Sequence, residues 1–262
     1  MKNLIINADD FGMTPGISRG ILDAHFYGVV TSTSAMMNSP HISESLAAAR
    51  KETPKLGVGV HLVLTWGKPL LPVDSVPTLV DAAGHFHKIH QLPGNADNFK
   101  IDEVHAEWGA QIEAFIAAGC MPDHLDSHHH SSYSNPKLFK VMLELAQKYD
   151  LPIRLPSRPE GRSLAIEPYV QIMGQHTIRY PLSCITAFYS EGVSIANLSR
   201  IISEVPQGIS ELMCHPGYVD SELKEGSSYT TAREAELRIL TSKDIKACIQ
   251  EYEVSLARFS DL

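Results

Sequence analysis

Two adjacent carboxylates follow a short apolar run near the start of the chain. Asp9 and Asp10 come shortly after Leu4-Ile5-Ile6, a run that predicts a buried strand over residues 4–8. Neighbouring side chains on a strand point in opposite directions. The two aspartates can therefore do different work at the end of one strand, one binding a metal ion and the other accepting a proton.

Histidine is the residue type that stands out, with 13 copies in 262 residues. His61 lies near the end of a predicted strand over residues 56–64, and Asp126 precedes His128, His129 and His130 in a predicted strand over residues 123–130. If this second strand runs unbroken, His128 and His130 share one face and His129 points away. The Asp-x-His spacing is typical of a ligating histidine with a carboxylate behind it. One carboxylate and two imidazoles form a three-ligand metal set that leaves positions open for water and substrate.

A metal ion held in this way polarises a carbonyl group and activates a water molecule. Asp9 can take the proton of that water, and His215, which follows a predicted strand over residues 209–214, can protonate the leaving group. Arg154, in a short predicted strand over residues 151–156, can orient the base or hold substrate through its forked guanidinium. Together these groups are typical of amide or ester hydrolysis.

Each of these residues also has a structural alternative. Asp9 can cap the following helix, Arg154 can form a structural ion pair, and His215 can lie in a turn with an exposed ring. A thiol nucleophile at Cys214 is disfavoured, because its neighbour His215 would point to the other side of the strand.

Strands alternate with helices along the chain. Hydrophobic patterning predicts strands over residues 4–8, 29–37, 56–64, 123–130, 151–156 and 209–214, and near 176–180. It predicts helices over residues 17–27, 41–52, 101–118, 136–149, 195–204, 230–240 and 242–258, and near 168–173. This order favours a parallel α/β sheet with outer helices, whose active site lies at the carboxyl ends of the strands. We expect one catalytic domain over residues 1–262, with a long irregular loop at about 65–100.

Charge and cysteine content narrow the class of protein. The chain has 22 Lys and Arg against 30 Asp and Glu, a net charge of −8. This balance argues against nucleic acid or an anionic membrane as the partner. The 4 cysteines form no C-x-x-C pair, which is typical of reduced thiols. The start of the chain also lacks a signal-peptide pattern, so we expect a cytoplasmic protein.

Five pieces of the sequence, in order, resemble the YdjC-like family of carbohydrate deacetylases, which includes chitooligosaccharide deacetylases. They span residues 7–217 and are Asn7-Ala8-Asp9-Asp10-Phe11-Gly12, Gly59-Val60-His61-Leu62, Asp126-Ser127-His128-His129-His130, Arg154-Leu155-Pro156 and Cys214-His215-Pro216-Gly217. The family's histidine run often continues with one more histidine, where this chain has Ser132.

The resemblance implies an irregular, TIM-barrel-like (β/α) barrel that forms a homodimer. It implies a divalent metal, usually magnesium, with zinc in related deacetylases; two histidines suit zinc better, since magnesium prefers oxygen ligands. The implied site residues are Asp10, His61 and His128 as metal ligands, Asp9 as base, Arg154 as the partner of the base and His215 as acid.

We therefore expect a metal-dependent hydrolase that removes acetyl groups from a small sugar or oligosaccharide containing N-acetylglucosamine. Trp66 and Phe86 can stack on a sugar ring or simply pack the long loop. One alternative is a metal hydrolase of a non-sugar amide or phosphoester, although only Arg154 and Arg158 offer positive charge near the expected site. Another is a metal or sugar binder without activity.

Overall fold

The strands form one parallel sheet in the computed structural model, which describes residues 1–92, 96–156 and 167–262. Within these ranges the sheet has 7 strands in the order β4-β3-β2-β1-β6-β5, with β7 paired to β1. The strands are β1 (Lys2–Phe11), β2 (Ser32–Ala35), β3 (Gly57–Leu62), β4 (Leu125–Ser127), β5 (Cys184–Ile185), β6 (Gly208–Cys214) and β7 (Val254–Ala257).

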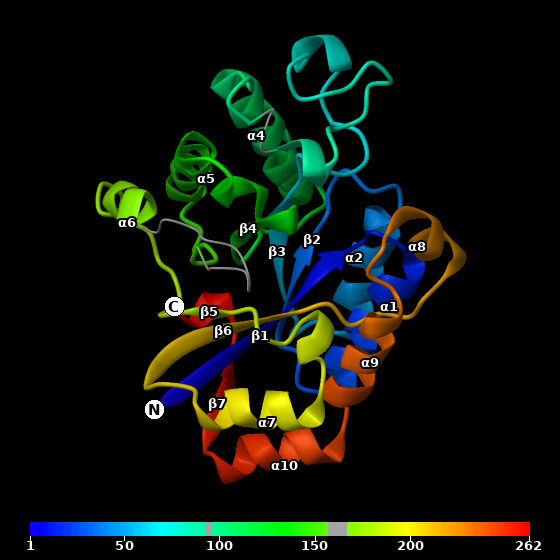
Figure 1. Ribbon diagram of the computed structural model, residues 1–262, viewed down its shortest axis with the longest axis vertical. Helices are drawn as coiled ribbons and strands as arrows, with labels where there is room; N and C mark the ends of the chain where they lie inside the picture. The colour runs from blue at the N-terminus through cyan, green and yellow to red at the C-terminus, as the bar shows by residue number, and fades with distance from the viewer. Residues whose placement is uncertain (93–95, 157–166) are drawn as a thin grey trace.

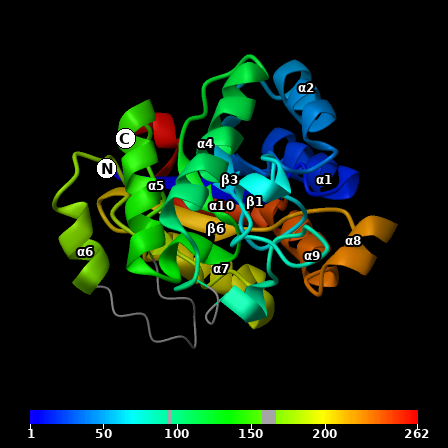
Figure 2. The same ribbon diagram turned by 90° about the horizontal axis from the view of Figure 1, so that it is seen from above.

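Helices surround the curled sheet (Figures 1 and 2). Three groups pack as neighbours: α5 with α4 and α6, α1 with α2 and α9, and α7 with α10. The α-helices are α1 (Pro15–Phe26), α2 (Ile42–Glu52), α4 (Ile101–Ala117), α5 (Pro136–Tyr149), α6 (Glu167–Met173), α7 (Ile195–Ser203), α8 (Ser221–Gly226), α9 (Thr231–Leu240) and α10 (Lys243–Glu251). Short 3₁₀ turns are η1 (Val73–Ser75), η2 (Ile89–Gln91), η3 (His128–Tyr133), η4 (Ser190–Gly192) and η5 (Phe259–Asp261). The parallel sheet curls into a half-barrel with helices outside it, which confirms the predicted fold class.

Strand β1 is the centre of the sheet and is longer than predicted. It pairs with β6 through residues 2–8, and on its other side first with β7 and then with β2. Its apolar run is completely buried, as expected for a parallel strand covered on both faces. The pairing with β2 becomes irregular between Ala8 and Phe11, and Asp10 has a φ of 73°. Because β1 extends to Phe11, the two aspartates are among the last residues of the strand and do not lie in the loop after it.

Outside the strands that carry the site, three further predicted elements differ from the structure. The last helix ends at Glu251, because Glu253 has a φ of 53° and β7 then pairs with β1. Residues 151–156 contribute only an isolated bridge at Ile153, since the flanking prolines donate no backbone hydrogen bond. Residues 176–180 form no strand, although the Arg179 carbonyl accepts a bond from the Ile153 amide at 3.0 Å.

The described part of the loop at 65–100 is tied to helix α4. Glu107 accepts from the amides of Leu70 and Leu71 at 2.9 and 3.0 Å, and Glu103 accepts from the Thr78 amide at 2.8 Å. Phe86 is only 1% exposed and belongs to the core, so its predicted stacking on a sugar is wrong and its packing role is confirmed.

The single domain over residues 1–262 stays a prediction. Across the described ranges, every helix is too short or too polar to cross a bilayer.

Candidate active site

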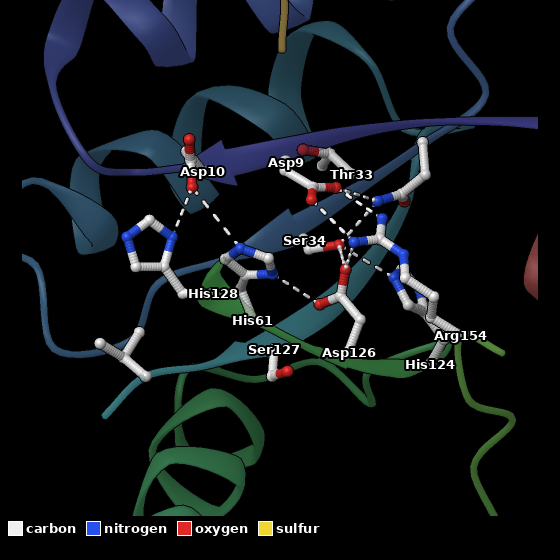
Figure 3. Close-up of polar contacts among 12 residues, drawn as sticks. Asp9, Asp10, Thr33, Ser34, His61, His124, Asp126, Ser127, His128 and Arg154 are labelled. Atoms are coloured by element: carbon white, nitrogen blue, oxygen red, sulfur yellow. Dashed lines mark hydrogen bonds and ion pairs between the residues drawn. The ribbon is translucent and has the colours of Figure 1, made fainter. Parts of the chain in front are cut away.

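Three predicted metal ligands converge at the carboxyl edge of the sheet. Figure 3 shows Asp10 from β1 facing His61 from β3 and His128 from η3. Asp10 Oδ1 lies 2.9 Å from His128 Nδ1 and 3.5 Å from His61 Nε2, and the three side chains are buried. Their potential ligand atoms all lie within 4.8 Å of one another. These distances bring together the three residues that the sequence singled out.

Asp126 orients His61. Their strands are paired with His61 and Asp126 in register, and Asp126 Oδ1 accepts from His61 Nδ1 at 2.7 Å (Figure 3). The sequence spacing placed this carboxylate behind His128, which is wrong, because register neighbours on adjacent strands share a face of the sheet. The Nδ1 bond leaves His61 Nε2 facing Asp10, as in carboxylate–histidine–metal arrangements.

Burial lowers the pKa of His61, but the charge of Asp126 and the bonds to both aspartates outweigh it. Together they raise the pKa to about 10. The imidazole thus prefers to hold a positive charge next to Asp10, and a metal cation would take the place of that proton.

The histidine run does not continue the strand. Strand β4 ends at Ser127, and the next residues form η3, in which His129 and His130 have φ values of 56° and 54°. The alternation expected for a strand therefore fails here. His128 alone of the three approaches Asp10, while His129 Nδ1 lies 2.9 Å from the Thr65 hydroxyl and His130 stacks on a tyrosine ring.

Asp9 is held by Arg154. The guanidinium donates to both carboxylate oxygens of Asp9 at 2.6 and 2.7 Å, and the side-chain amide of Asn7 donates to Asp9 Oδ1 at 2.9 Å. Burial raises the pKa of Asp9, but the charge and hydrogen bonds of Arg154 outweigh it and lower the pKa below its ordinary value. Asp9 is therefore ionised at neutral pH. Its predicted alternative as a helix cap is wrong, since Thr14 caps α1.

Arg154 is itself fully buried and pairs with further carboxylates. Besides Asp9, it contacts Asp126 Oδ2 at 2.9 Å and Glu211 Oε1 at 2.7 Å. The ion-pair interpretation and the interpretation as partner of a base therefore both agree with its position. Arg158 lies outside the described residues.

His215 lies beside Asp9 at the end of β6. Its Nε2 atom is 3.8 Å from Asp9 Oδ2, and its side chain is 13% exposed, so the alternative of an exposed turn is wrong. Burial lowers its pKa to about 4, against the opposing charge of Asp9. The ring is therefore neutral at pH 7 in this structure. Its backbone amide donates to Glu236.

Helix α9 supplies two groups that the sequence analysis missed. Arg233 donates to Asp10 Oδ2 at 2.6 Å, and Glu236 accepts from the backbone of His215. Both side chains are buried. A signal was present, because Arg233, Glu236 and Leu240 recur at helical spacing on the face that packs inward.

Comparison with known proteins agrees with this geometry. Residues 3–251 match the family described as YdjC-like protein. The chain belongs to the YdjC-like family. A relative from Enterococcus faecalis, named carbohydrate deacetylase, is 41% identical and aligns over 100% of this chain and 98% of its own length. A carbohydrate deacetylase from Thermoanaerobacter pseudethanolicus is 37% identical over the full length of both chains.

Solved structures support the same fold for this YdjC-like chain. A crystal structure from Enterococcus faecalis, of a protein whose proposed role is cellobiose-phosphate cleavage, superposes with a TM-score of 0.92 at 40% identity. It covers 99% of this chain and 98% of its own. A family 4 carbohydrate esterase from Streptomyces lividans has a TM-score of 0.55 at 11% identity, covering 98% and 92% of the chains, which shows a shared fold.

The described residues of the YdjC-like chain offer two clusters that could hold a metal. One consists of Asp9, His61 and Asp126, but the Arg154 guanidinium already contacts both of its carboxylates. The other consists of Asp10, His61 and His128, where Asp10 Oδ1, the oxygen that faces both imidazoles, is buried without a hydrogen-bond partner. One carboxylate and two imidazoles suit a divalent metal. The second cluster is the one that fits.

Proposed function

We propose that this protein is a metal-dependent carbohydrate deacetylase acting on acetylated sugars that contain N-acetylglucosamine. The observation that carries the proposal is the division between the two aspartates. Asp10 faces His61 and His128, while Asp9 is held by Arg154 and faces His215. The full-length relatives named carbohydrate deacetylase support the sugar substrate.

In the proposed reaction, Asp10, His61 and His128 hold a divalent metal. When bound, this ion supplies the positive charge that polarises the acetyl carbonyl and acidifies a water molecule. Asp9 then accepts the proton of the water at Oδ2, the oxygen that faces His215. Arg154 keeps Asp9 ionised and fixes the direction of its carboxylate.

His215 serves as the acid that releases the sugar. Because its ring is neutral at pH 7, the proton it donates must first be acquired within the reaction. Asp9 Oδ2 lies 3.8 Å from Nε2 of His215, so the proton taken from water can pass from Asp9 to His215. From Nε2 it goes to the amide nitrogen as the bond to the acetyl carbon breaks. The products are acetate and a free amino sugar.

A hydrolase of phosphoesters or of non-sugar amides is the alternative. The role proposed for the Enterococcus faecalis structure, cleavage of cellobiose phosphate, names a phosphorylated sugar as that protein's substrate. A phosphate site needs positive charge that is free to bind the ligand. Arg154 and Arg233 are instead paired with carboxylates at 2.6 to 2.9 Å, which favours the deacetylase.

The test is release of acetate from N,N′-diacetylchitobiose, measured beside a panel of cellobiose phosphate, 4-nitrophenyl phosphate and acetanilide. We expect acetate release from the sugar, its loss in EDTA, and recovery when a divalent metal is added back. Turnover of a phosphorylated substrate with no acetate release would overturn the proposal in favour of the alternative.

We further propose that the metal is Mg²⁺, with Zn²⁺ as the alternative, and that the protein is a cytoplasmic homodimer. Elemental analysis of protein purified without chelators identifies the metal. The presence of two imidazoles among the three proposed ligands favours Zn²⁺, whereas the family resemblance favours Mg²⁺. Sedimentation at two protein concentrations tests the dimer.

A further inference from the structure

A chain of contacts leads from the metal-ligand cluster to an exposed aromatic ring. Arg233 donates to Asp10 through Nη2 and to the Tyr229 carbonyl through Nε, at 2.6 and 3.0 Å. Its guanidinium carbon lies 5.5 Å from the centre of the Tyr229 ring. Tyr229 in turn stacks on Tyr189, with ring centres 4.3 Å apart and planes inclined by 16°.

Tyr229 is fixed by polar contacts as well as by stacking. Its hydroxyl donates to Glu236 Oε1 at 2.5 Å and accepts from the Ser190 amide at 3.1 Å. The second of these bonds ties the segment that carries Tyr189 to the tyrosine beneath it. The Tyr189 ring is therefore held at the surface by its stacking on the half-buried Tyr229 and by the bond from the Ser190 amide to the Tyr229 hydroxyl.

Tyr189 lies beside the proposed acid. Its ring centre is 5.4 Å from that of His215, with planes inclined by 61°, and Tyr229 meets the same imidazole at 5.7 Å and 68°. Tyr189 is nevertheless 40% exposed. An aromatic side chain held in one position, with part of its surface open to solvent next to reacting groups, is suited to bind an apolar surface of a substrate.

We propose that Tyr189 is the platform on which a pyranose ring of the substrate lies, with the acetyl group directed toward Asp9 and His215. The proposal rests on the proposed function, and it assigns a binding residue that the sequence motifs do not contain. The carbon-bound hydrogens on one face of a pyranose form an apolar surface that matches an aromatic ring. The contacts of Tyr229 hold this surface in place before the sugar binds, which lowers the entropy cost of binding.

The test compares Tyr189→Ala and Tyr189→Phe with a control, Tyr252→Ala, which removes a ring of similar exposure (39%) at the end of α10. The probe is N,N′-diacetylchitobiose. Binding to each variant is measured by calorimetry in an Asp9→Asn background, so that the sugar is not consumed. KM and kcat are measured in the otherwise unchanged chain.

We expect Tyr189→Ala to weaken binding and raise KM by roughly tenfold, equivalent to about 1.4 kcal/mol, with kcat changed less than about twofold. Tyr189→Phe should restore most of the affinity that Tyr189→Ala loses, because it keeps the ring, and Tyr252→Ala should match the unchanged chain. If the unchanged chain releases acetate but Tyr189→Ala binds the sugar equally well, the platform is wrong and the proposed function stands. If the unchanged chain neither binds nor deacetylates the sugar, both are wrong.

Discussion

Arg233 and Asp10 form a buried ion pair across 223 residues of sequence. Nη2 of Arg233 lies 2.6 Å from Asp10 Oδ2, with the two side chains 4% and 3% exposed. The other oxygen of Asp10 faces His61 and His128. Arg233 of helix α9 thus pairs with Oδ2 of Asp10, and Oδ1 stays available to the cluster with His61 and His128.

The first prediction concerns the loss of this pair. Arg233→Met removes the guanidinium from the buried Asp10 carboxylate and leaves it only the imidazoles of His61 and His128, which should cost up to about 3–5 kcal/mol of unfolding free energy in metal-free protein. The melting temperature should then fall by roughly 10 °C. Added Zn²⁺ or Mg²⁺ should raise it more in the variant than in the unchanged chain, because a cation at Asp10 replaces the lost charge.

Thermal unfolding followed by circular dichroism, with EDTA and with metal, measures both effects. Arg238→Met is the matched control, because Arg238 lies on the same helix with an exposed side chain. Equal melting temperatures for the two variants would show that the ion pair between Arg233 and Asp10 contributes nothing to the stability of the folded protein.

The second prediction concerns the carboxylate behind His61. Asp126→Asn weakens the acceptor for His61 Nδ1 and should reduce metal affinity about 10- to 100-fold, as for other carboxylates that orient ligating histidines. Asp123→Asn is the control, since Asp123 forms the same kind of bond, at 2.6 Å, to His124 and not to a proposed ligand. Titration calorimetry gives the two affinities, and equal losses in both variants would contradict the role assigned to Asp126.

The third prediction concerns pH and Glu236. Burial raises its pKa from 4.5 to about 7, against the hydrogen bonds from Tyr229 and His215 that lower it. Between pH 4.5 and about pH 7, Glu236 keeps its proton in the folded chain and has lost it in the unfolded chain. The contribution of Glu236 to stability therefore falls as the pH rises. The loss between pH 5 and pH 8 should be on the order of 2–3 kcal/mol. Glu236→Gln should remove that part of the pH dependence.

Urea unfolding of both chains at pH 5 and pH 8 measures the difference. Effects of all other titrating groups are common to the two chains and cancel in the comparison. Parallel pH profiles would mean that Glu236 titrates near its ordinary value in the folded protein.

The sequence predicted the residues that follow apolar strands and missed those on helices. Asp10 and His61 were found because parallel strands bring their carboxyl ends to one edge, and the structure places them there. Arg233 was missed although it shares a helical face with Glu236 and Leu240, because a charged residue on an amphipathic helix is more often solvated than buried. Partner choice was also beyond the sequence: Asp126 binds His61 through strand register, which no local spacing reveals.

Local backbone geometry limited the prediction in the same way. The alternation rule assumed that the strand continued through the histidine run, but the left-handed conformations of His129 and His130 redirect the chain after Ser127. The ring at Tyr189 had no signal in the sequence, since its place beside His215 depends on contacts between three separate segments.

The central claim is that the adjacent aspartates divide the work, Asp10 holding the metal and Asp9 accepting the proton. Its most direct test measures metal content and acetate release from N,N′-diacetylchitobiose in Asp9→Asn and Asp10→Asn. Asp9→Asn should bind metal as the unchanged chain does while its rate falls about 10²- to 10⁴-fold. Asp10→Asn should lose the metal and the activity together. Near-normal activity in Asp9→Asn, or normal metal content in Asp10→Asn, would contradict the account.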